Sequence, residues 1–267
     1  MTAQRHPYFA GGARPRIFAH RGFVSPELSA SGIVDNTRAA FASAVAAGAE
    51  YLETDCHLTR DGRVVVFHDD DLVRVAGDPR AVSDVTFAEL TRILEHRGGA
   101  LALEDALAAF PDSRFNIDVK ARAAADPLGR IVAPHGHRVL LTGFDDEARA
   151  LALRAAADEI EAGNASVLPA ASPGKAGISR ALLAAWSGSR RAVARALAGF
   201  DALQIPERRG AVRVLGRRLL DAAHANGVEV HVWTVNDADR MRRLIASGVD
   251  GVVTDRTDIA VAALRTP

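Results

Sequence analysis

Ionisable side chains alternate along one short stretch of the sequence, residues 51–69, which reads YLETDCHLTRDGRVVVFHD. Successive side chains of a β-strand point to opposite faces, so Glu53, Asp55 and His57 are expected on one face. Charged groups are almost never fully buried unless they are paired or bind a metal. The pattern therefore indicates either a network of ion pairs or a site for a cation.

A second strand-like segment, FNIDVK at residues 115–120, carries similar groups, with Asp118 and Lys120 on one face. If the two strands are neighbours, Glu53, Asp55 and Asp118 point to one region. Three carboxylates packed together repel strongly, so either they take up protons or a cation neutralises them. Hard oxygen ligands suit Mg²⁺ or Ca²⁺ better than zinc. Ordinary ion pairs with arginines are the alternative.

Two histidines and an arginine lie close to these carboxylates in the predicted arrangement. His20 and Arg21 end the first strand-like run, and His68 ends the apolar run after the turn. A hairpin that turns at residues 60–62 sets position 68 roughly opposite position 54. A histidine moves protons near neutral pH, and an arginine grips two phosphate oxygens at once.

Apolar runs of strand length alternate with helical stretches rich in alanine and leucine. The strand runs cover residues 16–20, 51–58, 115–120, 139–143, 166–170, 202–206, 229–235 and 250–255. Alternating strands and helices predict a parallel sheet, and eight such strands predict an α/β fold, the (β/α)8 TIM barrel. A doubly wound open sheet is the alternative, but no glycine-rich phosphate fingerprint follows the first strand. We expect a single domain over residues 1–267, with residues 1–15 as a loose N-terminal segment.

The run VVVFHD at residues 64–69 follows the second strand after only a short turn. Parallel neighbours need a crossover of about a dozen residues, so this connection predicts an antiparallel β-hairpin extension after the second strand. Asp61 and Gly62 are favourable residues for a hairpin turn. The polar segment 69–99 is expected to form a loop over the same face, with a helix near residues 86–95.

Composition excludes several classes of protein. The formal net charge is zero, which argues against a nucleic-acid partner. The single cysteine excludes an intramolecular disulfide framework. We find no apolar signal core and no run long enough to span a bilayer, so we expect a cytoplasmic protein without a transmembrane segment. The sequence does not indicate the oligomeric state.

At this point the sequence resembles a known family, the glycerophosphodiester phosphodiesterases. The resemblance rests on AHRG, DNT, YLETDCHLTRDGRVVVFHDDDL, FNIDVK and VHVWTVND followed by GVDGVVTDRTD, and it runs from about Ile17 to Asp258. Residues 140–200 carry little of it. It implies a TIM barrel with a hairpin after the second strand. It also implies metal-dependent hydrolysis of glycerophosphodiesters to glycerol 3-phosphate and an alcohol such as choline or ethanolamine.

The resemblance also implies roles for the ionisable residues. His20 and His68 would form the general acid/base pair. Glu53 and Asp55 would bind one divalent cation, with Asp118 as the third carboxylate. The ion would be Mg²⁺ or Ca²⁺, with Mn²⁺ as a further option. Water and a neighbouring glycerol hydroxyl both stay open as the nucleophile.

Three further residues complete the implied site. Arg21 and Lys120 would hold the oxygens of the substrate phosphate. Trp233 would line the pocket for the alcohol part of the substrate, and its alternative is plain packing in the barrel. The segment 69–99 shows no apolar lid for an acyl chain, which favours deacylated substrates.

Two positions depart from the family pattern, which has glutamate at both. Asp118 is one methylene shorter than glutamate, which weakens its reach to a metal. Asp35 stands where it could simply cap the first helix, with Asn36 as the competing cap.

Two alternative functions stay open at this stage. One is a barrel that binds a metal and a phosphorylated ligand without turnover, and the presence of both histidines argues against it. The other is a phospholipase D-like phosphodiesterase of the same superfamily that forms a cyclic phosphate. The toxins of that kind are secreted and disulfide-bonded, which this sequence does not suggest.

Overall fold

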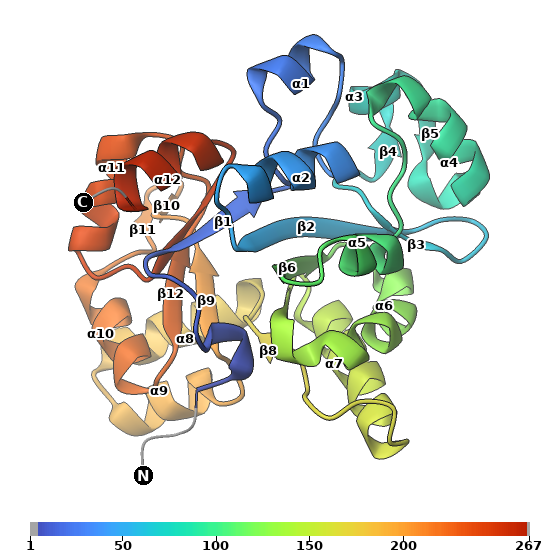
Figure 1. Ribbon diagram of the computed structural model, residues 1–267. Coiled ribbons are helices and arrows are strands. Elements are labelled where there is room, and N and C mark those ends of the chain that lie inside the picture. The colour runs from blue at the N-terminus through green and yellow to red at the C-terminus, as the bar shows by residue number, and fades with distance from the viewer. Residues whose placement is uncertain (1–4, 266–267) are drawn as a thin grey trace.

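The computed structural model describes residues 5–265; residues 1–4 and 266–267 lie outside the described part. Eight parallel strands form the central sheet in the spatial order β8-β7-β6-β2-β1-β13-β12-β9, and Figure 1 shows the helices arranged around them. The strands are β1 (Arg16–His20), β2 (Tyr51–Leu58), β6 (Arg114–Val119), β7 (Val139–Thr142), β8 (Ala170–Ala171), β9 (Ala202–Ile205), β12 (Glu229–Val232) and β13 (Gly251–Thr254).

The two end strands of this order, β8 and β9, come together and close the barrel. The Asp201 N–H donates to the Ala171 carbonyl at 2.9 Å, and the Asp201 carboxylate accepts from the Ala171 N–H at 2.9 Å. The predicted (β/α)8 TIM barrel is therefore confirmed.

Helices separate the strands along the chain, and most of them cover the outside of the sheet. The helices are α1 (Pro26–Ala30), α2 (Arg38–Ala46), α3 (Val73–Ala76), α4 (Phe87–Ile93), α5 (Leu103–Ala109), α6 (Ala125–Val132), α7 (Asp146–Glu161), α8 (Lys175–Ser187), α9 (Arg190–Leu197), α10 (Arg217–Ala225), α11 (Ala238–Ala246) and α12 (Thr257–Arg265). Of these, α1, α3 and α4 lie in segments beyond the barrel wall (Figure 1). Among residues 5–265, no helix has both the length and the apolar character needed to cross a membrane.

The apolar face of the central strands lies under the helices, as the alternation predicts. Leu52 and Cys56 of β2 and Ile117 of β6 belong to one buried cluster with side chains from α2, α5 and α6. The opposite face of β2, with Glu53 and Asp55, therefore points into the barrel.

The fifth barrel strand is shorter and later than predicted. A strand was expected over residues 166–170, but β8 covers only Ala170–Ala171. Pro169 directly precedes it, and a proline has no N–H to donate to the ladder. The Leu168 carbonyl bonds instead to the His6 ring at 2.7 Å.

The hairpin after β2 is present. The strand β3 (Val64–Val66) pairs antiparallel with β2 in a register that sets Val66 opposite Cys56. Extending this register puts position 68 opposite position 54, as predicted. The Gly62 N–H donates to the Thr59 carbonyl at 2.9 Å and closes the turn.

Residues 69–99 form a small packed unit rather than a loop over the barrel. The unit holds β4 (Asp71–Leu72), α3, β5 (Asp78–Ala81) and α4, and α4 matches the predicted helix. Its apolar side chains, such as Leu72, Val82 and Leu90, form their own cluster with Val65 of the hairpin. The prediction of a loop over this face of the barrel is therefore wrong, because the apolar side chains of residues 69–99 pack against one another and against the hairpin.

The N-terminal segment, expected to be loose, is packed against the barrel over its described residues 5–15; residues 1–4 lie outside the described part. Tyr8 and Phe9, in a short 3-10 helix (Pro7–Phe9), are 0% and 3% exposed. Tyr8 packs edge-on against Tyr51 at the start of β2, with ring centroids 5.4 Å apart. Burial of two aromatic rings holds the segment in place.

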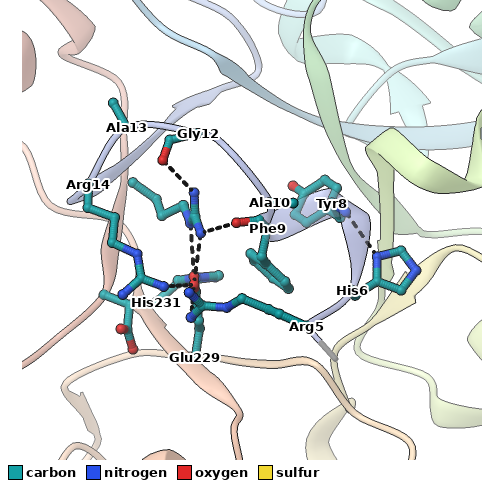
Figure 2. Close-up of polar contacts among 12 residues, drawn as sticks. Arg5, His6, Tyr8, Phe9, Ala10, Gly12, Ala13, Arg14, Glu229 and His231 are labelled. Carbon is teal, nitrogen blue, oxygen red and sulfur yellow. Dashed lines mark hydrogen bonds and ion pairs between the residues drawn. The ribbon is translucent and has the colours of Figure 1, made fainter. Parts of the chain in front are cut away.

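A buried ion-pair network joins this segment to the barrel (Figure 2). Arg16, the first residue of β1, contacts both carboxylate oxygens of Glu229, the first residue of β12, at 3.0 Å each. Arg5 and Arg14 also contact Glu229, and His231 lies 3.0 Å from it. Because these residues start their strands, the network lies at the amino end of the barrel.

The network lowers the pKa of the Glu229 carboxyl group. Burial alone would raise the pKa of Glu229, but hydrogen bonds from His231 and Arg16 outweigh burial and hold that pKa at about 2. The group therefore stays ionised while almost fully buried, and its charge is matched by the arginines.

The substitution Glu229→Gln is expected to lower the free energy of unfolding by about 3 kcal/mol, because it leaves the buried Arg16 guanidinium without its counter-charge. Urea unfolding of both proteins measures the difference. The control is Arg14→Gln at the exposed rim of the network, which is expected to lower the free energy of unfolding by about 1 kcal/mol or less. An unchanged unfolding free energy for Glu229→Gln would contradict this account of the network.

Candidate active site

A cavity of about 890 Å³ opens at the carboxyl ends of the strands. All eight residues predicted to form the site contribute to its wall: His20, Arg21, Glu53, Asp55, His68, Asp118, Lys120 and Trp233. Carboxyl ends of strands are where barrel enzymes place their reactive groups. The structure therefore brings the predicted residues together, although it does not by itself assign their roles.

His20, the last residue of β1, is held by an aspartate that the sequence analysis did not assign. Its Nδ1 lies 2.6 Å from Asp255 Oδ1, and its Nε2 lies 4.0 Å from Glu53 Oε2. Burial alone would lower the pKa of His20, but the charge of Glu53 and the hydrogen bond with Asp255 raise it above its ordinary value.

Asp255 is itself fixed by Asn236. The Asn236 side-chain amide donates to Asp255 Oδ2 at 2.8 Å, and its carbonyl oxygen accepts from the Asp255 backbone N–H at 2.9 Å. Asp255 directly follows β13, which pairs with β1, so barrel closure brings it beside His20. A carboxylate at the carboxyl end of the predicted strand 250–255 was the available sequence signal.

His68 is held in a similar way by its neighbour in the chain. Its Nδ1 lies 2.6 Å from Asp69 Oδ1, and Arg74 contacts the other oxygen of Asp69 at 2.5 Å. His57, on the same face of β2 as Glu53 and Asp55, lies with Nε2 3.2 Å from the His68 carbonyl oxygen. It therefore contacts the backbone of His68 and lines a separate cavity.

Strand register brings the three carboxylates together. Glu53 pairs with His20 across β1 and β2, and Asp55 stands directly opposite Asp118 across β2 and β6. Glu53 is 7% exposed, Asp55 2% and Asp118 7%. Burial raises the pKa of Glu53, and the charge of Asp55 raises it further.

Lys120 bridges two of these carboxylates. Its ammonium lies 3.1 Å from Asp55 Oδ1 and 3.0 Å from Asp118 Oδ2. Burial would lower the pKa of Lys120, but the two carboxylates raise it. Burial raises the pKa of Asp118 although Lys120 opposes the rise. Although Asp118 is shorter than the glutamate of the family pattern, its carboxylate is long enough to contact Lys120.

Arg21 follows β1 in a left-handed conformation, with φ 59°. Its backbone N–H lies 3.0 Å from both the Glu53 carbonyl and Glu53 Oε2. Its guanidinium faces Asp55 at 3.3 Å and Asp35 at 3.5 Å. The next residue, Gly22, also has positive φ, and a Cβ there would lie 2.7 Å from the α2 backbone, so the turn requires glycine.

The segment before α2 supports this turn instead of capping the helix as predicted. The cap is Thr37, whose hydroxyl accepts from the Ala40 N–H at 3.2 Å. Asn36 is buried with φ 56°, and its side-chain oxygen accepts from the Thr54 hydroxyl at 2.8 Å. Asp35 pairs with Arg21 and also with Arg74. The expectation that Asp35 or Asn36 caps the helix is therefore wrong.

The site can be tested for its fit to a divalent cation. Among residues 5–265, no three His, Cys, Asp or Glu side chains converge as a ready ligand set. Two buried carboxylate oxygens make no hydrogen bond: Asp118 Oδ1, and Asp55 Oδ2, which is ion-paired with Arg21 Nε at 3.3 Å. Buried oxygens without a hydrogen bond are costly unless they bind something, and hard oxygens suit Mg²⁺ or Ca²⁺. The donors therefore fit a cation, once Lys120 shares or yields its contacts.

Trp233 stands at the end of β12 beside another aromatic ring. It packs edge-on against Phe144, with ring centroids 6.0 Å apart. Deeper in the cavity, the Gln204 amide donates to Asn116 at 2.8 Å. Phe144 and Gln204 line the cavity, and the sequence analysis did not single them out.

Paired histidines, carboxylates and cations at this end of a TIM barrel are the features of a barrel hydrolase that acts on an anionic ester. Comparison with known proteins gives the class. The model of the glycerophosphoryl diester phosphodiesterase family matches residues 20–259. The chain therefore belongs to this family, and it is a phosphoric diester hydrolase.

One sequence relative agrees with the family, and two solved structures share the fold. A protein of Mycobacterium tuberculosis named probable glycerophosphodiester phosphodiesterase 2 is 35% identical over 244 residues, 90% of this chain and 87% of that protein. A solved glycerophosphodiester phosphodiesterase from Thermotoga maritima has a TM-score of 0.65 at 24% identity, covering 92% of this chain and 96% of that one. An Oleispira antarctica phosphodiesterase in complex with the product sn-glycerol-3-phosphate has a TM-score of 0.67 at 20% identity, covering 94% and 96%.

The substitution Asp255→Asn is expected to lower kcat on a glycerophosphodiester by about tenfold or more, because His20 loses the charge that holds its ring. Steady-state kinetics measure the effect. The matched control is Asp258→Asn, an aspartate paired with Arg256 on the same segment and absent from the cavity wall. Equal kcat for the wild-type protein and Asp255→Asn would contradict a positioning role.

Proposed function

We propose that this protein hydrolyses glycerophosphodiesters to glycerol 3-phosphate and an alcohol, with a divalent cation and with His20 and His68 as the general acid/base pair. One observation carries the proposal: both histidines line the cavity that holds the carboxylates, and each has Nδ1 2.6 Å from an aspartate. The product seen with the Oleispira relative supports glycerol 3-phosphate as the product here.

The partner aspartates determine which ring nitrogen of each histidine is free for proton transfer. Nδ1 is used in the contact with Asp255 or Asp69, so Nε2 of each ring remains for proton transfer. One histidine takes a proton from the nucleophile, and the other donates a proton to the leaving alkoxide. Because the partner aspartates come from different loops, the two rings are held independently.

Lys120 and Arg21 supply positive charge that can neutralise the oxygens of a phosphodiester. Lys120 uses two of its three protons on Asp55 and Asp118, which leaves one for a phosphate oxygen. Arg21 faces Asp55 through Nε and offers a planar fork suited to phosphate. We assign both to the substrate phosphate, where they stabilise negative charge in the transition state.

Glu53, Asp55 and Asp118 are the residues that would hold the cation, with Asp118 Oδ1 and Asp55 Oδ2, which make no hydrogen bond, as its first ligands. Bound there, Mg²⁺, Ca²⁺ or Mn²⁺ would act as a Lewis acid toward a phosphoryl oxygen. Trp233 lines the same cavity and offers an apolar face to the substrate beyond the phosphate. The cytoplasmic location stays a prediction.

Chelation tests the cation. Purified protein with glycerophosphocholine is expected to release glycerol 3-phosphate, to lose this activity in excess chelator, and to recover it with Mg²⁺, Ca²⁺ or Mn²⁺ added separately. An enzyme-coupled assay for glycerol 3-phosphate measures release. Full activity in chelator, after metal analysis shows that no ion is retained, would contradict metal dependence. Binding of glycerophosphocholine without release would favour a sensor.

Replacing either catalytic histidine tests the acid/base pair. His20→Ala and His68→Ala are each expected to lower kcat by about 10²-fold or more while the circular dichroism spectrum stays unchanged. The matched control is His224→Ala, because His224 also contacts an aspartate, Asp250, at 2.8 Å but lies outside the cavity wall. Full turnover in either variant would refute the assignment.

A further inference from the structure

The cavity continues beyond the reactive groups, and its outer wall carries only positive charge. Lys175 at the start of α8 and Arg208 and Arg209 of the small strand β10 (Arg208–Arg209) line this part. The only acidic side chains in the wall of the whole cavity are Glu53, Asp55 and Asp118 at the ends of β2 and β6. The outer wall therefore has three cations and no carboxylate.

In the described part of the chain, these three cations have no ion pair, as is also true of other surface arginines such as Arg180 and Arg213, but they differ from those two in lining the cavity. Most arginines along the chain pair with a nearby carboxylate, as Arg122 does with Glu147. Among the ion pairs of residues 5–265, none includes Lys175, Arg208 or Arg209. The one side-chain hydrogen bond of this set goes from Arg208 to the Ala211 carbonyl at 3.1 Å, within the hairpin of β10 and β11 (Val212–Arg213).

The Phe144 ring in the cavity wall is already in contact with two lysine side chains. The ammonium groups of Lys120 and Lys175, the only two lysines of the chain, lie 5.2 Å and 4.9 Å from the centroid of the Phe144 ring. An aromatic face is the usual binding place for a quaternary ammonium such as choline. Here a bound choline would meet two ammonium groups at the same ring, and their repulsion would weaken its binding.

The apolar neighbours of these cations strengthen their effect. Ile178 and Leu182 of α8 and Val214 after the hairpin line the same part of the cavity. Lys175, Arg208 and Arg209 are themselves exposed, so the apolar walls reduce screening by water on one side only, and salt still weakens the attraction of these cations for an anion.

We propose that the outer wall is an anion-binding subsite formed by Lys175, Arg208 and Arg209, which favours glycerophosphodiesters whose alcohol part carries a phosphate or another negative group. The inference rests on the proposed function, because it places the scissile phosphate at the inner end. The guanidinium forks suit a phosphate monoester, which carries about −2 charge at neutral pH, and the lysine adds a point charge.

A matched pair of substrates tests the subsite. Glycerophosphoinositol and glycerophosphoinositol 4-phosphate differ only by one phosphate on the alcohol part, and glycerophosphocholine adds the cationic case. The ratio kcat/KM is expected to be about tenfold higher for glycerophosphoinositol 4-phosphate than for glycerophosphoinositol, whose alcohol part is uncharged, and lowest for glycerophosphocholine. Added salt is expected to reduce the preference, because exposed charges are screened.

Substitution of Lys175 and Arg209 tests whether these residues form the subsite. The double variant Lys175→Met/Arg209→Gln is expected to raise KM for the phosphorylated substrate about tenfold, as for two exposed charge pairs, with kcat and the turnover of glycerophosphoinositol little changed. Matched controls are Arg180→Gln on α8 and Arg213→Gln on β11, both exposed and outside the cavity wall. These controls are expected to leave both substrates unaffected.

Equal kcat/KM for the two inositol substrates, or an unchanged KM in the double variant, would overturn the subsite while leaving the hydrolase intact. A preference for an acylated diester whose alcohol part carries no negative charge would overturn it as well. If no diester is hydrolysed, the proposed function fails first, and calorimetric binding of glycerophosphoinositol 4-phosphate then decides the subsite: weaker binding to the double variant than to the wild-type protein supports it, and equal binding overturns it.

Discussion

The balance of charge inside the carboxyl end of the barrel is the constraint on which the site depends. Three carboxylates, Glu53, Asp55 and Asp118, are each less than a tenth exposed, and removing such groups from water costs several kcal/mol each unless they are matched. Lys120 and Arg21 supply part of the match. Glu53, Asp55 and Asp118 still outnumber these two cations, and Asp55 Oδ2 and Asp118 Oδ1 make no hydrogen bond, so a divalent cation can be accommodated here together with an anionic substrate.

The rest of the site is built around that cluster by backbone geometry. The tight turn through Arg21 and Gly22 points a backbone N–H at Glu53, and the buried Asn36 fixes the turn from behind by donating its N–H to the Arg21 carbonyl. The hairpin after β2 returns His68 to the carboxylates from the other side. At the opposite end of the barrel, the pairing of Arg16 with Glu229 joins β1 to β12. Stability and chemistry thus use separate ion-pair networks at the two ends of one barrel.

Much of this arrangement could be predicted from the sequence, because it depends on local rules. Strand alternation correctly set Glu53 and Asp55 on the inner face, and the short turn correctly predicted the hairpin. What could not be predicted depends on contacts between distant segments. Asp255 meets His20 only because the last strand closes against the first. The N-terminal segment reads as loose until the buried face of Tyr51 is known. The short β8 follows from Pro169, a local signal in the sequence.

The account depends most directly on the binding of one divalent cation by the paired carboxylates, which can be measured without turnover. Calorimetric titration of the metal-free protein with Mg²⁺, Ca²⁺ and Mn²⁺ is predicted to show one bound ion per chain for at least one of them, and Asp55→Asn is predicted to abolish that binding. Absence of binding in the wild-type protein, or equal binding in Asp55→Asn, would contradict the account.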